Sequence, residues 1–403
     1  MMNSTLNICN LYIFLWCIYS LQGTLYASGS IISQGILAIL LAISLFSIIY
    51  ANSKFEMPPY MKALNVMVLM FTIYGVALLL SPEQLYVREE DVGMVSHKDY
   101  LKNIYASLLP IYAFFIFAKK ELLTESLLRK CIPIFLTVAV ASFFRAQSEM
   151  VEQAEEMLSI QEEFTNNSGY LFLTLLPLLL FVKRPILQYL LLLICGLFIV
   201  AAMKRGAILI FALSLPLFIH STMKTLSLKR KIVILMLIIG SALAILYYVS
   251  YMLDTSEYFN SRLQDTLEGN ASNRETIYPH LLRQIFYFAT PLQFLFGRGA
   301  WATLKVSDNF AHNDWLELGV NQGVLGVCLY VMYWIAFYIT AKGLGNGTVR
   351  NATMYVMLIS FLMTMFSMSY DNMPICATIV IGYCMANYKN DEAQYAKNNM
   401  LYR

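Results

Sequence analysis

A histidine beside the predicted start of a membrane helix is the strongest candidate for chemistry in this sequence. His312 lies in the run FAHNDWLELG, residues 310–319. Asp314 and Glu317 have the D-x-x-E spacing of a capping box, so we expect a helix to begin at Asp314. The positive end of a helix disfavours a charged imidazole. The sequence therefore predicts a neutral His312 that can accept a proton, with a purely structural loop histidine as the alternative.

Several cations lie on the predicted outer side of the membrane, where positive charge is disfavoured, and close to apolar segments, where loss of hydration is costly. Lys204 and Arg205 occupy a very short turn between two apolar runs, and one polar loop carries five more: Arg262, Arg274, Arg283, Arg298 and Lys305. Cations in such places usually have an acidic partner or an anionic ligand. The planar fork of arginine suits phosphate. For Arg205 we therefore expect a phosphate-bearing ligand, with snorkelling to the interface as the alternative. Arg262, Arg283 and Arg298, each taken alone, fit ordinary loop cations better than ligand contacts.

The elements that position these residues are predicted to be membrane helices. Hydrophobic residues make up 59% of the 403 residues and charged residues only 13%, against roughly 25% charged in soluble domains. A bilayer core requires roughly 20 apolar residues per helix. Such runs fall near residues 8–26, 30–51, 60–81, 101–118, 129–145, 168–182, 185–203, 205–221, 231–252, 316–341, 352–369 and 372–388. The seven cysteines all lie in apolar runs, and we expect them to be free.

Charge predicts the orientation of these helices. With the N-terminus inside, 17 of the 28 Lys and Arg and only 5 of the 25 Asp and Glu fall in inner segments. Inner segments then carry a net charge of +12 and outer segments −9, as the positive-inside rule requires. We expect an all-α, polytopic integral membrane protein with about twelve transmembrane helices and both termini cytoplasmic. The first run has no basic flank or cleavage motif and is expected to remain as an anchor.

Three outer loops are long in this topology. Residues 82–100 and 146–167 are acidic, and a large extracytoplasmic loop, residues 253–315, lies between helices 9 and 10. The two halves of the chain show no internal repeat, so residues 1–403 are predicted to form a single transmembrane domain. His312 ends the large loop, and Gly319, Gly323 and Gly326 follow at spacings that permit close approach of another helix.

These motifs together resemble those of the O-antigen ligase and polymerase superfamily, bacterial membrane glycosyltransferases of the GT-C type. The run from Ala311 through Gly326 is similar to the family's His-Asn signature. Four further motifs lie upstream in the same order: NSGY at 167–170, KRGA at 204–207, SNRE at 272–275 and LFGRG at 295–299. The resemblance covers about residues 165–345. Asn273 stands where many relatives have glycine, which bears on loop shape.

The resemblance implies a glycan donor linked through pyrophosphate to undecaprenol and an acceptor hydroxyl, with no cofactor, no metal and no nucleic acid. Arg205 and Arg274 would hold the pyrophosphate, and His312 would be the base. Asn313, Arg298, Lys204 and Arg283 would contact substrate. Implied partners are the lipid-linked oligosaccharide, membrane lipid, and a chain-length regulator or other assembly proteins. The location would be the bacterial cytoplasmic (inner) membrane, with the site facing the periplasm.

Three functions remain open at this point. A polymerase would extend O-antigen or capsular repeat units, and it is preferred because polymerases are the more numerous group. A ligase would transfer the finished chain to a lipid or protein acceptor with the same residues. A polysaccharide transporter or flippase would also suit twelve spans, but such folds usually show repeated halves and charged or broken helices near the midplane.

Overall fold

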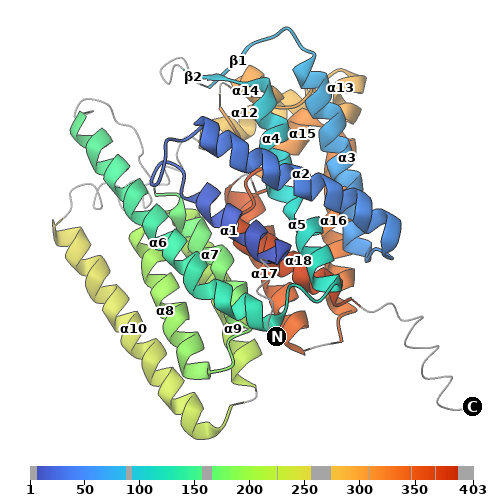
Figure 1. Ribbon diagram of the computed structural model, residues 1–403. Coiled ribbons are helices and arrows are strands. Elements are labelled where there is room, and N and C mark those ends of the chain that lie inside the picture. Colours follow the sequence, from blue (N-terminus) through green and yellow to red (C-terminus); the bar gives the residue numbers. More distant parts are fainter. Residues whose placement is uncertain are drawn as a thin grey trace, which may run out of the picture.

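Helices make up nearly all of the computed structural model, which describes residues 7–87, 93–156, 166–224, 226–255, 274–307, 309–345, 347–367 and 369–388 (Figure 1). The N-terminal third comprises α1 (Ile8–Ser20), α2 (Ile31–Lys54), α3 (Pro59–Leu79), α4 (His97–Leu108), α5 (Pro110–Lys119) and α6 (Glu125–Glu156). One hairpin interrupts it: β1 (Leu85–Val87) pairs antiparallel with β2 (Gly93–Val95).

The second half contains four apolar helices, a layer of short and less apolar ones, and three closing helices. The first four are α7 (Ser168–Leu179), α8 (Pro185–Ala201), α9 (Arg205–Met223) and α10 (Leu228–Thr255). The short ones are α12 (Arg274–Phe286), α13 (Pro291–Phe296), α14 (Ala302–Ser307) and α15 (Asp314–Asn321). The chain then continues through α16 (Gly323–Lys342), α17 (Gly347–Phe366) and α18 (Ile375–Ala386). Figure 1 shows the short helices and the hairpin grouped at the upper end of the long helices.

Three helices without a polar face form the centre of the bundle. All residues of α18 from Ile375 to Met385 are buried, as are residues 110–117 of α5, and α18 packs directly on α5. α7 is almost wholly buried between α6, α8, α17 and α18. A helix that is hydrophobic on every side belongs in an interior. By contrast, α2, α3 and α10 expose large apolar side chains on their outer sides, as expected of surfaces that face lipid.

Seven helical stretches of the described residues are long and apolar enough to cross a membrane: α2, α3, α4 with α5, residues 125–148 of α6, α9, α16 and α17. Four other apolar helices are shorter: α1, α7, α8 and α18. The chain is therefore a helical, polytopic membrane protein, and the count of about twelve spans stays a prediction.

One of the predicted spans is broken in the structure, and another is not. The run at 101–118 forms one candidate span, because Leu109, between α4 and α5, keeps helical φ and ψ. The run at 316–341 is divided between α15 and α16 at Gly323, whose φ of 65° ends the first helix. The prediction of one continuous helix there was wrong, because a positive φ cannot continue a right-handed helix.

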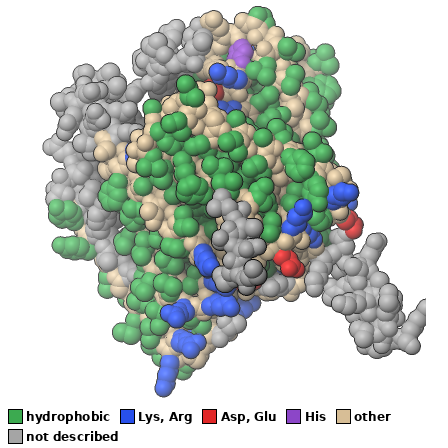
Figure 2. Space-filling view, in the orientation of Figure 1, with side chains coloured by type: hydrophobic (Ala, Val, Ile, Leu, Met, Phe, Trp, Pro, Cys, Tyr) green, Lys and Arg blue, Asp and Glu red, His purple; other side chains and the backbone are tan. Residues whose placement is uncertain are grey.

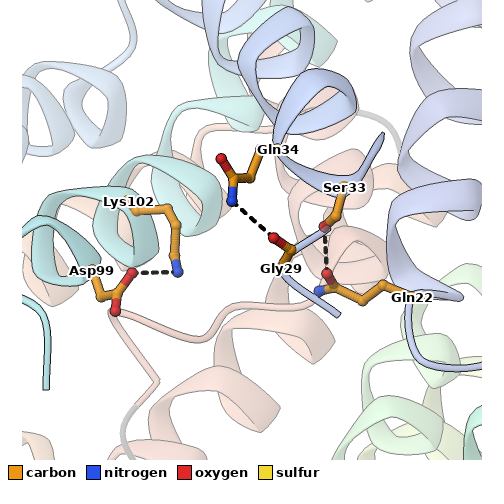
Figure 3. A network of polar contacts seen from close by, with 6 residues as sticks. All are labelled: Gln22, Gly29, Ser33, Gln34, Asp99 and Lys102. Carbon is orange, nitrogen blue, oxygen red and sulfur yellow. Dashed lines mark hydrogen bonds and ion pairs between the residues drawn. The ribbon is translucent and has the colours of Figure 1, made fainter. Parts of the chain in front are cut away.

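Polar contacts close the turn between α1 and α2 (Figure 3). The Ser33 hydroxyl donates to Gln22 Oε1 over 2.6 Å, and Gln34 Nε2 donates to the Gly29 carbonyl over 2.8 Å. Beside them, at the start of α4, Lys102 pairs with Asp99 over 2.5 Å. These contacts satisfy the turn's polar groups at the end of the bundle where α12–α15 lie.

Basic side chains gather at the opposite end. Figure 2 shows Lys and Arg side chains at the lower end of the molecule, where Figure 1 places the lower ends of α8, α9 and α10. Six cations lie in the connecting loops and in the first turn of α10 at this end: Lys183, Arg184, Lys224, Lys229, Arg230 and Lys231. The large loop predicted at 253–315 contains α12, α13 and α14, whereas residues 256–273, including Arg262 and Asn273, lie outside the described residues.

Candidate functional site

His312 lies in the short loop between α14 and α15 and has a left-handed backbone, with φ of 49°. This conformation costs a non-glycine residue roughly 1–2 kcal/mol, so neighbouring contacts must impose it. The Ala311 N–H donates to Glu317 Oε1 over 2.6 Å. On the other side, Asn313 Oδ1 accepts from the N–H groups of Trp315 at 3.0 Å and Leu316 at 3.2 Å. Both chain neighbours of His312 are therefore held in place.

The cap of α15 differs from the sequence prediction. The helix begins at Asp314 as expected, but Asn313 is the N-cap and supplies the capping oxygen. The predicted capping box between Asp314 and Glu317 was wrong, since both side chains are fully buried and bond to other elements. Asparagine is among the strongest N-cap residues, and its position one residue earlier frees both carboxyls for longer-range contacts.

Glu317 joins the His312 loop to α14. Its Oε2 accepts the Thr303 hydroxyl at 2.7 Å and Asn321 Nδ2 at 3.1 Å, while Oε1 accepts the Ala311 N–H. Burial raises the pKa of the Glu317 carboxyl to about 7, and these hydrogen bonds oppose that shift. Glu317 therefore anchors the backbone directly before His312.

Asp314 joins the same loop to α16 and to the segment between α17 and α18. Its carboxylate accepts the Ser369 N–H at 2.8 Å, the Ser369 hydroxyl at 2.5 Å and the Tyr330 hydroxyl at 2.6 Å. Burial raises the pKa of Asp314 to about 7 as well, against the same three donors. The two buried acids thus fix the His312 loop from opposite sides.

The C-terminal end of α17 is where the sequence motifs meet. Arg274 Nη2 and the Tyr170 hydroxyl each donate to the Phe366 carbonyl at 3.2 Å, and Asn313 Nδ2 donates to the Met365 carbonyl at 3.4 Å. The last carbonyls of a helix carry partial negative charge and lack helical partners. Residues from α7, α12 and the His312 loop therefore converge on one helix end.

Two glycines allow close packing around this helix end: Gly206 of α9 lies against Tyr170 and Phe366, and Gly169 of α7 lies against the turn between α8 and α9. A Cβ on Gly206 would lie 2.5 Å from the Tyr170 hydroxyl oxygen and 2.9 Å from Phe366 Cβ. A Cβ on Gly169 would lie 3.2 Å from Ala202 Cβ and 3.7 Å from Lys204 Cβ. A Cβ would overlap its neighbours at Gly206, so that approach requires glycine, whereas at Gly169 a Cβ would make tight contacts. Arg205 begins α9 beside Gly206, so its backbone is brought to the same place.

The electrostatics of His312 reflect these neighbours. Desolvation by the surrounding protein, followed by the positive charges of Lys204 and Arg274, lowers the pKa of His312 to about 4, although the residue is exposed at the protein surface. The imidazole is therefore neutral at physiological pH and can accept a proton. The two cations that act on it come from segments 70 residues apart in the chain.

The other two predicted substrate residues have different surroundings. Arg298 Nη2 donates to the carbonyls of Gln284 at 3.2 Å and Phe288 at 3.1 Å, so its guanidinium fastens the end of α12. Arg283 is exposed on α12 nine residues after Arg274, a spacing that places the two on opposite sides of a helix. The structure thus groups His312, Asn313, Lys204 and Arg274, with the backbone of Arg205 next to Lys204, and it leaves Arg283 and Arg298 apart from them.

Some residues of this site had no signal in the sequence. The carbonyls of Met365 and Phe366 act through the backbone, and Ser369 is paired with an acid 55 residues earlier in the chain. Tyr170 belonged to the NSGY motif but was assigned no role. No protein-family model matches this sequence, and no curated protein matches it either.

Proposed function

We propose that this protein transfers a glycan from undecaprenyl pyrophosphate to an acceptor hydroxyl at the outer face of the bacterial cytoplasmic membrane, acting as a repeat-unit polymerase. The observation that supports it best is a neutral histidine in the field of two cations, with a third cation in the adjoining turn. A base and an anion-binding group are what such a displacement requires.

The proposed reaction assigns each group one task. Arg274, Arg205 and Lys204 bind the pyrophosphate and stabilise its charge as it leaves. The acceptor oxygen attacks the anomeric carbon, the bond from that carbon to the pyrophosphate oxygen breaks, and the hydroxyl proton passes to His312. The products are the elongated glycan and undecaprenyl pyrophosphate, and the proton on His312 is then released to solvent.

Donor binding itself would prepare His312. The cations that keep its pKa low are the groups that the pyrophosphate would neutralise. Two or more negative charges nearby favour the protonated imidazole. The base would therefore be neutral before the donor arrives and would become a better proton acceptor in the complex.

The decisive genetic experiment is a glycolipid profile of the native host with this gene deleted and then complemented. Wild type and His220→Ala should restore the profile, and His312→Ala should not. His220 is a matched control because it is exposed near the opposite end of α9 from Arg205.

The deletion phenotype separates the three functions. Single repeats on the final acceptor support the polymerase. Long chains that accumulate on undecaprenyl pyrophosphate, with a bare acceptor, support a ligase instead. An unchanged profile in a host without a redundant gene would contradict glycan transfer and would favour a transporter or flippase.

A further inference from the structure

The segment that joins α12 to α13 exposes an unusually apolar surface. Residues 284–297 contain four phenylalanines and one tyrosine but no Asp, Glu, Lys or Arg, although they lie in an otherwise polar loop. Seven side chains form the exposed surface, which we call the 282–296 patch: Leu282, Phe286, Tyr287, Phe288, Leu292, Leu295 and Phe296. Figure 2 shows hydrophobic side chains at the upper right, where Figure 1 places α13.

The exposure of this patch is large. Tyr287 is 81% exposed, Leu292 70% and Phe288 65%. Water contact with that much apolar surface is unfavourable by about 25 cal/mol per Å², and contiguous exposed patches normally mark an interaction site. Phe286 packs on Phe294, with ring centroids 6.1 Å apart. Aromatic packing therefore orders the patch from within, while its outer surface is not buried by any described part of the protein.

Two contacts fix the level of the patch relative to the membrane helices. The Tyr74 hydroxyl donates to the Phe296 carbonyl, and Tyr74 lies five residues, or about 7–8 Å, before the end of α3. A Cβ on Gly323, the first residue of α16, would lie 2.6 Å from the Phe294 carbonyl oxygen and 2.7 Å from the Leu295 carbonyl carbon. The C-terminal part of α13 is thus held beside the ends of two membrane-spanning helices.

At this level the patch continues the apolar surface of those helices. Leu79 is 45% and Leu80 81% exposed at the end of α3, and Leu325 is 43% exposed in the first turn of α16. Side chains on spanning helices at these positions face the edge of the bilayer. The patch adds to the apolar surface that the ends of α3 and α16 present at the edge of the bilayer.

We infer that the 282–296 patch is inserted into the lipid headgroup region of the membrane, in the leaflet on the His312 side. Aromatic residues concentrate at this depth of a bilayer. Amphipathic segments that lie in the interface bury their apolar face about 5–10 Å deep. Arg283 and Arg298 flank the uncharged stretch, and Arg298 closes it by binding the Gln284 and Phe288 carbonyls. A lipid surface covers the patch in the protein's ordinary state.

The test measures the depth of fluorophores attached to single cysteines in liposomes. Cys328 is replaced by alanine first, because it is exposed whereas the other six cysteines are buried. An environment-sensitive dye is then attached at Tyr287→Cys and at Leu292→Cys. Leu69→Cys, 60% exposed at the middle of α3, reports the bilayer core. Pro82→Cys, exposed in the loop after α3, reports water.

We expect the dyes at 287 and 292 to be quenched several-fold more by lipids with a nitroxide near the headgroup than by lipids with a nitroxide deep in the chain. The dye at 69 should show the reverse order, and only the dye at 82 should be quenched fully by aqueous iodide. Iodide quenching at 287 and 292 equal to that at 82 would overturn the inference. Shielding from both iodide and nitroxide lipids would also overturn it and would indicate a protein cover.

Discussion

Arg274 illustrates how one side chain serves both the fold and the proposed chemistry. Its Nη2 already donates to the Phe366 carbonyl, which leaves the other nitrogens of the fork available for a phosphate. We expect Arg274→Lys to lower kcat/KM by about 100-fold, because an ammonium cannot make both contacts. Transfer from a synthetic lipid-linked repeat measures this, and Arg283→Lys is the control. Full activity of Arg274→Lys would show that Arg274 contributes only its positive charge and not a two-pronged hydrogen bond.

The pKa of His312 makes a separate prediction about pH. Because the pKa is lowered to about 4, the neutral base is present above that pH and is lost as the pH falls through it. The pH profile of kcat/KM reports the pKa values of groups in the free enzyme. Its acidic limb should therefore lie near pH 4. Lys204→Met removes a positive charge and should move this limb to higher pH. An acidic limb unaffected by Lys204→Met would argue against His312 as the titrating group.

At the scale of elements, two buried acids hold the His312 loop. The pKa values of Asp314 and Glu317 are raised to about 7, above the roughly 4 of an unfolded chain. The folded state therefore binds more protons between these values, and stability should fall as the pH rises from about 4 to 7. Melting temperatures at pH 5 and pH 8 measure this. Asp314→Asn should flatten the difference, and an unchanged pH slope would contradict the assignment.

The crossing of α13 on the junction of α15 and α16 depends on glycine. Gly323 has a φ of 65°, and a Cβ there would lie 2.5 Å from the Gly297 backbone nitrogen. We expect Gly323→Ala to destabilise the fold by more than about 1 kcal/mol, because both the backbone conformation and the space are unsuitable. Gly240→Ala is the matched control, since open space surrounds that position in α10. Equal melting temperatures for both variants would contradict this account.

The elements differ in how far the sequence predicts them. Hydropathy indicated each apolar helix, because a long apolar run has few other stable conformations in a bilayer. The layer of α12, α13 and α14 was expected only as a polar loop, because short helices show no strong hydrophobic periodicity in the sequence. The hydrogen-bond partners of Asp314 could not be predicted from the sequence either. Ser369 and Tyr330 meet it through tertiary packing, which no local spacing encodes.

For the whole molecule, charge asymmetry predicts which face is cytoplasmic. Cations gather in and beside the loops that join α7 to α8 and α9 to α10, at the end opposite α12–α15 (Figures 1 and 2). A cysteine at Arg283 should react with an impermeant maleimide in intact spheroplasts. A cysteine at Lys229 should react only after permeabilisation. The opposite pattern would place the His312 site in the cytoplasm and contradict the proposed topology.

The most direct test of glycan transfer is the reaction of purified protein in lipid nanodiscs with a synthetic undecaprenyl-pyrophosphate-linked repeat. The proposal predicts longer lipid-linked glycan together with released undecaprenyl pyrophosphate for wild type and His220→Ala. His312→Ala should bind the donor but yield product at least about 100-fold more slowly. Wild-type rates from folded His312→Ala, or no product from wild type supplied with donor and acceptor repeats, would contradict the account.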